Sequence, residues 1–347
     1  MRSMTDRDRR LVAGWLLVCA ALVFAIVLVG GVTRLTRSGL SIVEWQPLIG
    51  VLPPLSEADW QALFAKYRET PEFRQVNFDL TLEGFKGIFW WEYIHRLLAR
   101  AIGLVFLFPY AYFLAKRRLD RPLAWKLAGI FVLGALQGAM GWIMVQSGLV
   151  DDPKVNPVRL SAHLGIALAI FAAELWLALE LLYPRRFPLG KLEAALPLVA
   201  FLMALSGGMV AGLRAGSAYQ TFPLMNGHFV PPEVLMLEPW WRNFLYNMAT
   251  VQLVHRLFFW VLLILIPIAW WRMRHAAAAN ALAAAFVLQT ALGISTLLLG
   301  VPVGLGAAHQ GGAVLLLAAA LWNAHSAKKG VRTLFSPGGK RVLTPFP

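Results

Sequence analysis

Apolar residues dominate the chain in eight long stretches, which polar connectors separate. A helix of about 20 apolar residues spans the hydrocarbon core of a bilayer, which is roughly 30 Å thick. The pattern therefore predicts an all-α, polytopic membrane protein with eight transmembrane helices. The predicted spans are residues 11–31, 93–115, 124–147, 160–183, 192–212, 250–271, 278–300 and 304–325.

The composition agrees with a lipid bilayer as the solvent. Hydrophobic residues make up 59% of the 347 residues and charged residues only 14%, against roughly one-half and one-quarter in soluble domains. The net charge of +14 would suit a nucleic acid, but the basic residues cluster between the spans, and we expect no nucleic-acid partner. The first apolar stretch has no signal-peptide cleavage pattern, so we expect it to be retained as a span.

Basic residues in the short connectors predict the orientation. If the spans alternate in direction, all of these clusters fall on one face, which the positive-inside rule makes cytoplasmic. Both termini are then inside, and we expect a bacterial inner membrane. The clusters are Arg7, Arg9 and Arg10; Lys116, Arg117 and Arg118; Arg185 and Arg186; Arg272 and Arg274; and Lys328 and Lys329.

Two long connectors, residues 32–91 and 213–249, lie on the predicted outer face. In the first, Ser56-Glu-Ala-Asp59 has the pattern of a helix N-cap followed by a short helix. In the second, Asn226-Gly227 predicts a tight turn.

The two halves of the chain, residues 1–187 and 188–347, share motifs in the same order. This order indicates duplication of a four-helix unit, with the copies related in parallel because each has an even number of spans. We expect two pseudo-symmetric four-helix bundles, and glycines where helices pack closely. The matched motifs are Gly30-Gly31 with Gly207-Gly208, Arg37-Ser-Gly39 with Arg214-Ala-Gly216, His95-Arg96 with His255-Arg256, Gln137 to Gly141 with Gln289 to Gly293, and Ala162-His163 with Ala308-His309.

Four histidines begin even-numbered spans, which places them near the outer surface: His95, His163, His255 and His309. Ionisable groups inside a membrane are costly and usually functional. Two imidazoles at matched depth on neighbouring helices of one bundle suit the axial positions of a haem. Zinc is less favoured because no third ligand recurs, and copper because no thiolate or thioether recurs. The alternative is that these histidines only hydrogen-bond in helix packing.

Arginines at the outer rim are candidates for binding haem propionates. Arg96 and Arg256 each follow a histidine, and Arg37 and Arg214 lie just beyond the first and fifth spans. A guanidinium binds a carboxylate through two parallel hydrogen bonds. Snorkelling to lipid headgroups is the alternative.

Glu92 marks a difference between the halves. It lies three residues before His95 on the same helix face, and Gln252 stands in its place before His255. A carboxylate moves protons or stabilises positive charge, whereas an amide only hydrogen-bonds. The difference suggests chemistry in the first half and a resident cofactor in the second. Alternatively, Glu92 is an interfacial acid paired with Arg96 or Arg100.

The chain resembles the haem A synthase family over essentially its whole length. The residues that carry the resemblance are Gly30-Gly-Val-Thr-Arg-Leu-Thr-Arg-Ser-Gly-Leu-Ser41, Glu92-Tyr-Ile-His-Arg96, Gln137-Gly-Ala-Met-Gly-Trp142, His163, Gln252-Leu-Val-His-Arg256 and His309.

The resemblance implies two pseudo-symmetric bundles and oxidation of the C8 methyl group of haem O to the formyl group of haem A. It implies that His255 and His309 ligate a resident haem b. His95 and His163, with Arg96 beside them, would hold the substrate haem, and Glu92 would be the catalytic carboxylate. The first outer loop has no cysteine, so the chain is similar to the cysteine-free branch of proteobacteria and mitochondria.

The resemblance also suggests partners: haem O as substrate, the bilayer, and as candidates haem O synthase, an electron-transfer protein and a second copy of the chain. The rival hypotheses are a di-haem cytochrome b that only transfers electrons and, with less support, a haem transporter.

Overall fold

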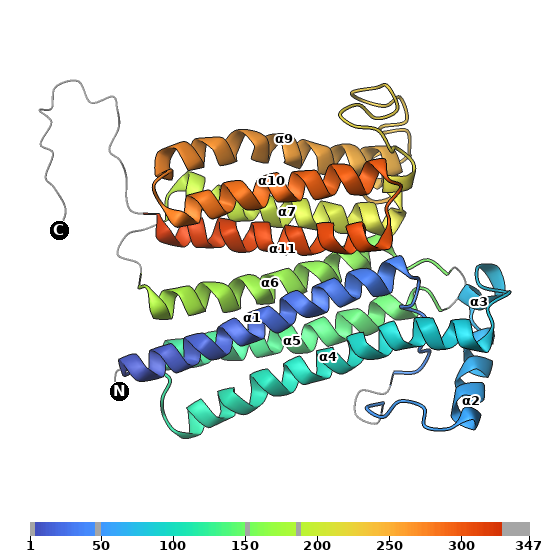
Figure 1. Cartoon of the computed structure of the whole chain (residues 1–347), viewed down its shortest axis with the longest axis horizontal. Helices are drawn as coiled ribbons and strands as arrows, with labels where there is room; N and C mark the ends of the chain where they lie inside the picture. The colour runs from blue at the N-terminus through green and yellow to red at the C-terminus, as the bar shows by residue number, and fades with distance from the viewer. Residues whose placement is uncertain (1–3, 46–49, 150–152, 185–188, 328–347) are drawn as a thin grey trace, which may run out of the picture.

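The computed structural model describes residues 4–45, 50–149, 153–184 and 189–327 (Figure 1). In this part of the chain the secondary structure is helical, apart from one isolated β-bridge. Eight helices are long and apolar enough to cross a membrane, which confirms the predicted all-α membrane fold. They are α1 (Asp6–Leu35), α4 (Leu82–Ala115), α5 (Arg121–Gln146), α6 (Pro157–Leu182), α7 (Lys191–Leu213), α9 (Met248–Met273), α10 (Ala277–Leu298) and α11 (Val303–Ser326).

These helices pack as two groups of four, which lie side by side (Figure 1). In the first unit, α1 and α5 each pack against both α4 and α6. In the second unit, α7 and α10 each pack against both α9 and α11. Therefore α4 and α6 occupy opposite corners of the first unit, and α9 and α11 occupy the same corners of the second. The predicted boundary at residue 187 lies outside the described residues.

The interface between the units repeats the same symmetry. Helix α1 packs against α11, and α6 packs against α7. Gln310 Nε2 donates to the carbonyl of Val27 at 2.9 Å in the first contact. Ser161 Oγ donates to the carbonyl of Leu205 at 2.8 Å in the second. Because α7 and α11 are the counterparts of α1 and α6, one two-fold operation relates both contacts, as expected for parallel repeats.

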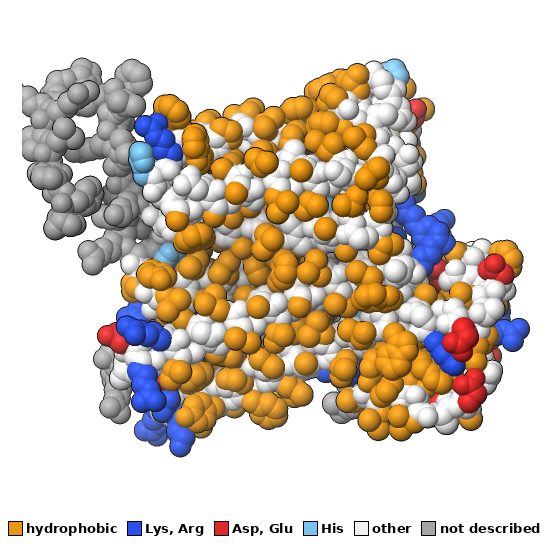
Figure 2. All heavy atoms as spheres, viewed as in Figure 1, with side chains coloured by type: hydrophobic (Ala, Val, Ile, Leu, Met, Phe, Trp, Pro, Cys, Tyr) orange, Lys and Arg blue, Asp and Glu red, His pale blue; other side chains and the backbone are white. Residues whose placement is uncertain are grey.

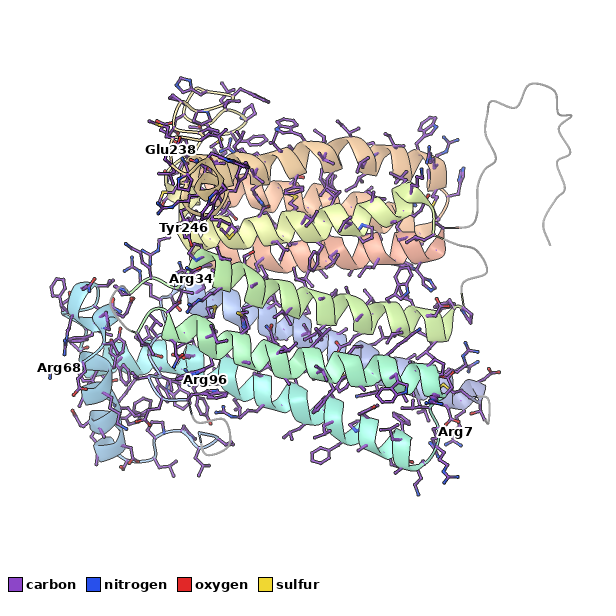
Figure 3. All side chains as sticks on the ribbon, turned by 180° about the vertical axis from the view of Figure 1, so that it is seen from behind. Arg7, Arg34, Arg68, Arg96, Glu238 and Tyr246 are labelled. Carbon is purple, nitrogen blue, oxygen red and sulfur yellow. The ribbon has the colours of Figure 1, made fainter. Side chains whose placement is uncertain are left out.

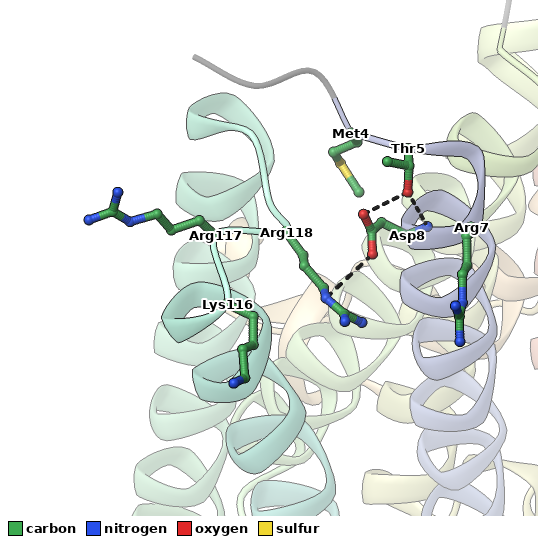
Figure 4. A pocket seen from close by; sticks show the side chains of 7 residues that line it. All are labelled: Met4, Thr5, Arg7, Asp8, Lys116, Arg117 and Arg118. Carbon is green, nitrogen blue, oxygen red and sulfur yellow. Dashed lines mark hydrogen bonds and ion pairs between the residues drawn. The ribbon is translucent and has the colours of Figure 1, made fainter.

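Charged side chains gather at the two ends of a largely hydrophobic surface (Figure 2). At one end, Arg118 Nε lies 3.6 Å from Asp8 Oδ1, which joins the α4–α5 connector to the start of α1. The same end has a basic cavity, which Lys116 and Arg117 also line (Figure 4). The prediction that this end is cytoplasmic is based on such cations. Arg185, Arg186, Lys328 and Lys329 lie outside the described residues.

The first outer loop folds onto an extension of α4. Its helices are α2 (Glu57–Arg68) and α3 (Pro71–Gln75), and the predicted cap at Ser56 is confirmed as a capping box with Asp59. Helix α4 begins at Leu82, well before the predicted span at residue 93. The extension is helical because it buries Phe85 and Phe89 against Trp60 and Tyr67 of α2.

The second outer loop contains the short helices η1 (Ala215–Ser217), η2 (Trp240–Arg242) and α8 (Asn243–Tyr246). The predicted turn is confirmed, because Asn226 and Gly227 have φ values of 50° and 90°. The flanking Met225 and His228 exchange two backbone hydrogen bonds of 2.7 and 3.1 Å.

Phe85→Ala should release the first outer loop from α4. Phe85 is fully buried, and truncation of a buried phenylalanine costs about 3–5 kcal/mol. Hydrogen exchange of the purified protein should show faster exchange in α2 while the long helices stay protected. Phe78→Ala is the control, because Phe78 is 69% exposed. Equal protection of α2 in both variants would contradict this account of the loop.

Candidate functional site

The four predicted histidines lie at one level, near the end of the molecule that carries the two outer loops. His163, His255 and His309 each lie about two turns after the start of α6, α9 and α11. His95 lies further along α4, because α4 projects beyond the other helices. It contacts Gly30, which is five residues before the end of α1. The expected common depth is therefore present.

Each imidazole lies against a glycine on an adjacent helix. A Cβ added to that glycine would come within 2.7–3.2 Å of the nearest ring atom. These contacts are tight, so a side chain at any of the four glycines would require the neighbouring imidazole to shift. The pairs are His95 with Gly30, His163 with Gly141, His255 with Gly207, and His309 with Gly293.

The two histidines of a unit lie close enough to influence each other. His95 and His163 interact electrostatically, and so do His255 and His309. The members of each pair come from opposite corners, whereas the sequence argument placed them on neighbouring helices. Opposite corners suit two axial ligands better, because the imidazoles approach one iron from opposite sides.

The donor set fits a haem in each unit. The Nδ1 atoms of His163 and His309 are buried and have no hydrogen-bond partner among the described residues, and each imidazole packs against a glycine. Among the described residues, no cluster of three or more His, Cys, Asp or Glu side chains is present. This arrangement does not suit tetrahedral zinc.

The imidazoles differ in their second contacts. His255 Nδ1 lies 2.8 Å from Ser206 Oγ, and that hydroxyl donates to the carbonyl of Met203 at 2.7 Å. His163 Nε2 lies 3.4 Å from the amide nitrogen of Gln137. The sequence analysis did not identify Ser206. In the sequence, only its position directly before Gly207 could have indicated that Ser206 belongs to the site.

Glu92 is 3% exposed and accepts several hydrogen bonds. Ser41 Oγ and the backbone N–H of Ile42 both donate to Oε2 at 2.8 Å. Arg96 Nε donates to Oε1 at 3.0 Å, which gives a buried ion pair one helical turn apart. The carboxylate is therefore held in place by α4 and by the loop that follows α1. The sequence analysis did not predict that this loop covers Glu92.

Arg96 also donates to the carbonyls of Ile42 and Glu44, at 2.7 and 2.8 Å. Its counterpart Arg256 donates to carbonyls of the second outer loop, among them Thr221 at 2.8 Å and Pro223 at 3.0 Å. Both guanidinium groups thus hold a loop over a histidine pair. Propionate binding by these two residues stays a prediction.

Gln252, in the position of Glu92, is also buried and donates to the carbonyl of Tyr219 at 3.0 Å. Within the part of the chain that the structure describes, its Oε1 atom has no hydrogen-bond partner. The second unit therefore has an uncharged amide where the first has a carboxylate.

Arg37 and Arg214 both have left-handed backbone conformations, with φ of 55° and 53°. Arg37 lies two residues after the end of α1, and Arg214 directly follows α7. They interact electrostatically with Arg34 and with the buried Glu72. Burial raises the pKa of Glu72, although these arginines oppose the rise. Arg34 also donates to carbonyls at the end of α7, and it lies at the same end of the molecule as Arg96 (Figure 3).

Comparison with known proteins gives one consistent result. The model of the cytochrome oxidase assembly protein family matches residues 13–321. A protein of Nitrosospira multiformis named Heme A synthase is 58% identical over 92% of this chain and 94% of its own length. Proteins of the same name from Nitrosomonas eutropha and Parvibaculum lavamentivorans are 52% and 46% identical. They match 90% and 94% of this chain and 92% and 96% of their own lengths.

Gly293→Ala should displace the imidazole of His309. The added Cβ would come within 2.7 Å of Cε1, and overpacking of this kind costs about 1–3 kcal/mol. The absorption spectrum of the protein purified in the presence of haem should change. Gly304→Ala on α11 is the matched control, because nothing lies within 4 Å of its added Cβ. An unchanged spectrum in Gly293→Ala would show that His309 does not depend on this contact.

Proposed function

This chain belongs to the family of cytochrome oxidase assembly proteins, and from that premise we propose that it is a haem A synthase. It oxidises the C8 methyl group of haem O to the formyl group of haem A. The observation that carries the proposal is the repeated pair of histidines on opposite helices of each unit, combined with the buried carboxylate Glu92 where the second unit has the amide of Gln252.

The second unit is proposed to hold a resident haem b. His255 and His309 would ligate its iron from opposite corners of the bundle. A haem held by two imidazoles transfers single electrons, and this is the chemistry that the group supplies here. Gln252 cannot ionise, so this unit has no acid or base at the position of Glu92.

The first unit is proposed to bind the substrate haem O. His95 and His163 would orient the macrocycle, with Arg37 and Arg214 as candidates for propionate binding. Arg96 holds Glu92 and the loop that follows α1, so the carboxylate has a fixed position beside His95. Glu92 would either accept a proton or stabilise positive charge that develops at the substrate edge.

The reaction requires two oxidation steps at one carbon. Two successive hydroxylations would give a gem-diol, which loses water to form the aldehyde. Each hydroxylation removes two electrons from the carbon and needs an external oxidant: either dioxygen, or an electron-transfer protein as acceptor with water as the source of oxygen. A fixed carboxylate beside the bound methyl group would serve both steps, because each generates a proton or a developing positive charge that an anion stabilises.

The membrane orientation follows from the charges at the two ends. We propose a bacterial inner membrane, with both termini in the cytoplasm and the histidine pairs near the periplasmic side. Candidate partners are haem O synthase, an electron-transfer protein and a second copy of the chain.

Expression with a source of haem O tests the proposed activity. Pigments extracted from the membranes and separated by chromatography with mass detection should include haem A or its hydroxymethyl precursor. Recovery of haem O and haem b alone would favour the rival hypothesis of a cytochrome b that only transfers electrons.

Glu92→Gln should keep the bound haem b but lower formation of haem A by about 100-fold or more, since a positioned acid or base contributes 10²–10⁴. Glu83→Gln on the same helix is the control, because Glu83 is an exposed partner of Lys86. Product yields in Glu92→Gln equal to those of the control would rule out a catalytic role for this carboxylate.

A further inference from the structure

A chain of two hydrogen bonds lies behind His255 and favours one tautomer of its ring. Ser206 has one hydroxyl hydrogen, which it donates to the carbonyl of Met203 at 2.7 Å. A carbonyl only accepts, so this bond has a single direction. With that hydrogen donated to Met203, Ser206 Oγ is left as an acceptor 2.8 Å from His255 Nδ1. The tautomer of His255 that matches this arrangement has its hydrogen on Nδ1 and a free lone pair on Nε2, which is the form that ligates iron.

The first unit has no such chain. Val29 precedes Gly30 in the position where Ser206 precedes Gly207, and a valine side chain neither donates nor accepts. His95 makes no side-chain hydrogen bond to any residue that the structure describes. Nothing polar in the described part of the chain therefore fixes the tautomer of His95.

The two counterpart rings also differ in orientation. A Cβ on Gly207 would meet Cε1 and Nδ1 of His255, at 3.2 and 3.7 Å. A Cβ on Gly30 would meet Nε2 and Cδ2 of His95, at 3.2 and 3.5 Å. His95 thus turns its Nε2 edge toward α1, whereas His255 turns its Nδ1 edge toward α7. The ring held by Ser206 presents Nε2 on the side away from the serine.

We propose that Ser206 is the positioning residue that makes the second unit the permanent haem site, and that Val29 leaves His95 free to exchange its haem. The inference rests on the proposed function, in which one haem is a cofactor and the other a substrate. A cofactor must stay through many turnovers, whereas the product must leave after each one. An N–H···O bond fixes the ring and makes the imidazole a stronger ligand, which favours retention of ferric haem.

Ser206→Ala tests the proposal in membranes from cells that make haem b but no haem O. The loss of one such partner weakens ligation by about 10-fold to 100-fold, so the low-spin haem should dissociate faster from the purified protein by a comparable factor. Its midpoint potential should rise, because a weaker imidazole stabilises ferric iron less. Ser206→Thr keeps the hydroxyl and should restore both values.

Val29→Ala is the matched control at the equivalent position of the first unit. It should leave the potential and the retention of the resident haem unchanged. Ser206→Cys replaces Ser206→Ala if the alanine variant fails to accumulate. Cysteine is close to serine in size, but its sulfur is a weaker hydrogen-bond acceptor. The midpoint potential of Ser206→Cys should therefore rise, by less than the rise expected for Ser206→Ala.

A potential and a dissociation rate equal to wild type in Ser206→Ala, or in Ser206→Cys where only that variant accumulates, would overturn the proposal. Equal shifts in Val29→Ala would overturn it too, because the effect would then not be specific to Ser206. Failure of the proposed function has a different signature: the wild-type protein would contain no low-spin haem in these membranes, or would form no haem A from haem O.

Discussion

The structure depends on one close contact: each of the four imidazoles packs directly against a glycine of the adjacent helix. A Cβ on Gly293 would lie 2.7 Å from His309, and one on Gly141 would lie 3.0 Å from His163. These contacts fix how closely α10 approaches α11 and α5 approaches α6. They keep both rings at one level, so that each can face its partner across the unit.

A duplicated scaffold thus provides two similar sites, and a few substitutions make them different. Glu92 is replaced by Gln252, which removes a charge from the second site. Val29 is replaced by Ser206, which adds a hydrogen-bond acceptor behind the histidine. Arg96 and its counterpart instead have the same role, because each holds an outer loop through backbone carbonyls. The loops are held alike, while the polar groups around the two histidine pairs differ.

Much of this could be predicted from the sequence, because apolar length, turn residues and repeated motifs are local signals. The eight spans and the cap at Ser56 are of this kind. The extension of α4 was missed because aromatic packing against α2, a tertiary contact, stabilises it. From the sequence, Gly30 was expected only to allow close helix packing. Its contact with His95 could not be predicted, because the sequence of a helix does not show which neighbouring helix it packs against. Ser206 was missed because one hydroxyl in an apolar span has no pattern of its own.

The central claim is that each histidine pair holds one haem and that only the second pair holds the resident one. The most direct test replaces His95, His163, His255 and His309 singly by alanine and measures the low-spin haem b of each purified variant by spectroscopy. The account predicts that the His255 and His309 variants lose this signal, whereas the His95 and His163 variants keep it. A signal that survives loss of His255 or His309, or disappears with His95 or His163, would contradict the assignment.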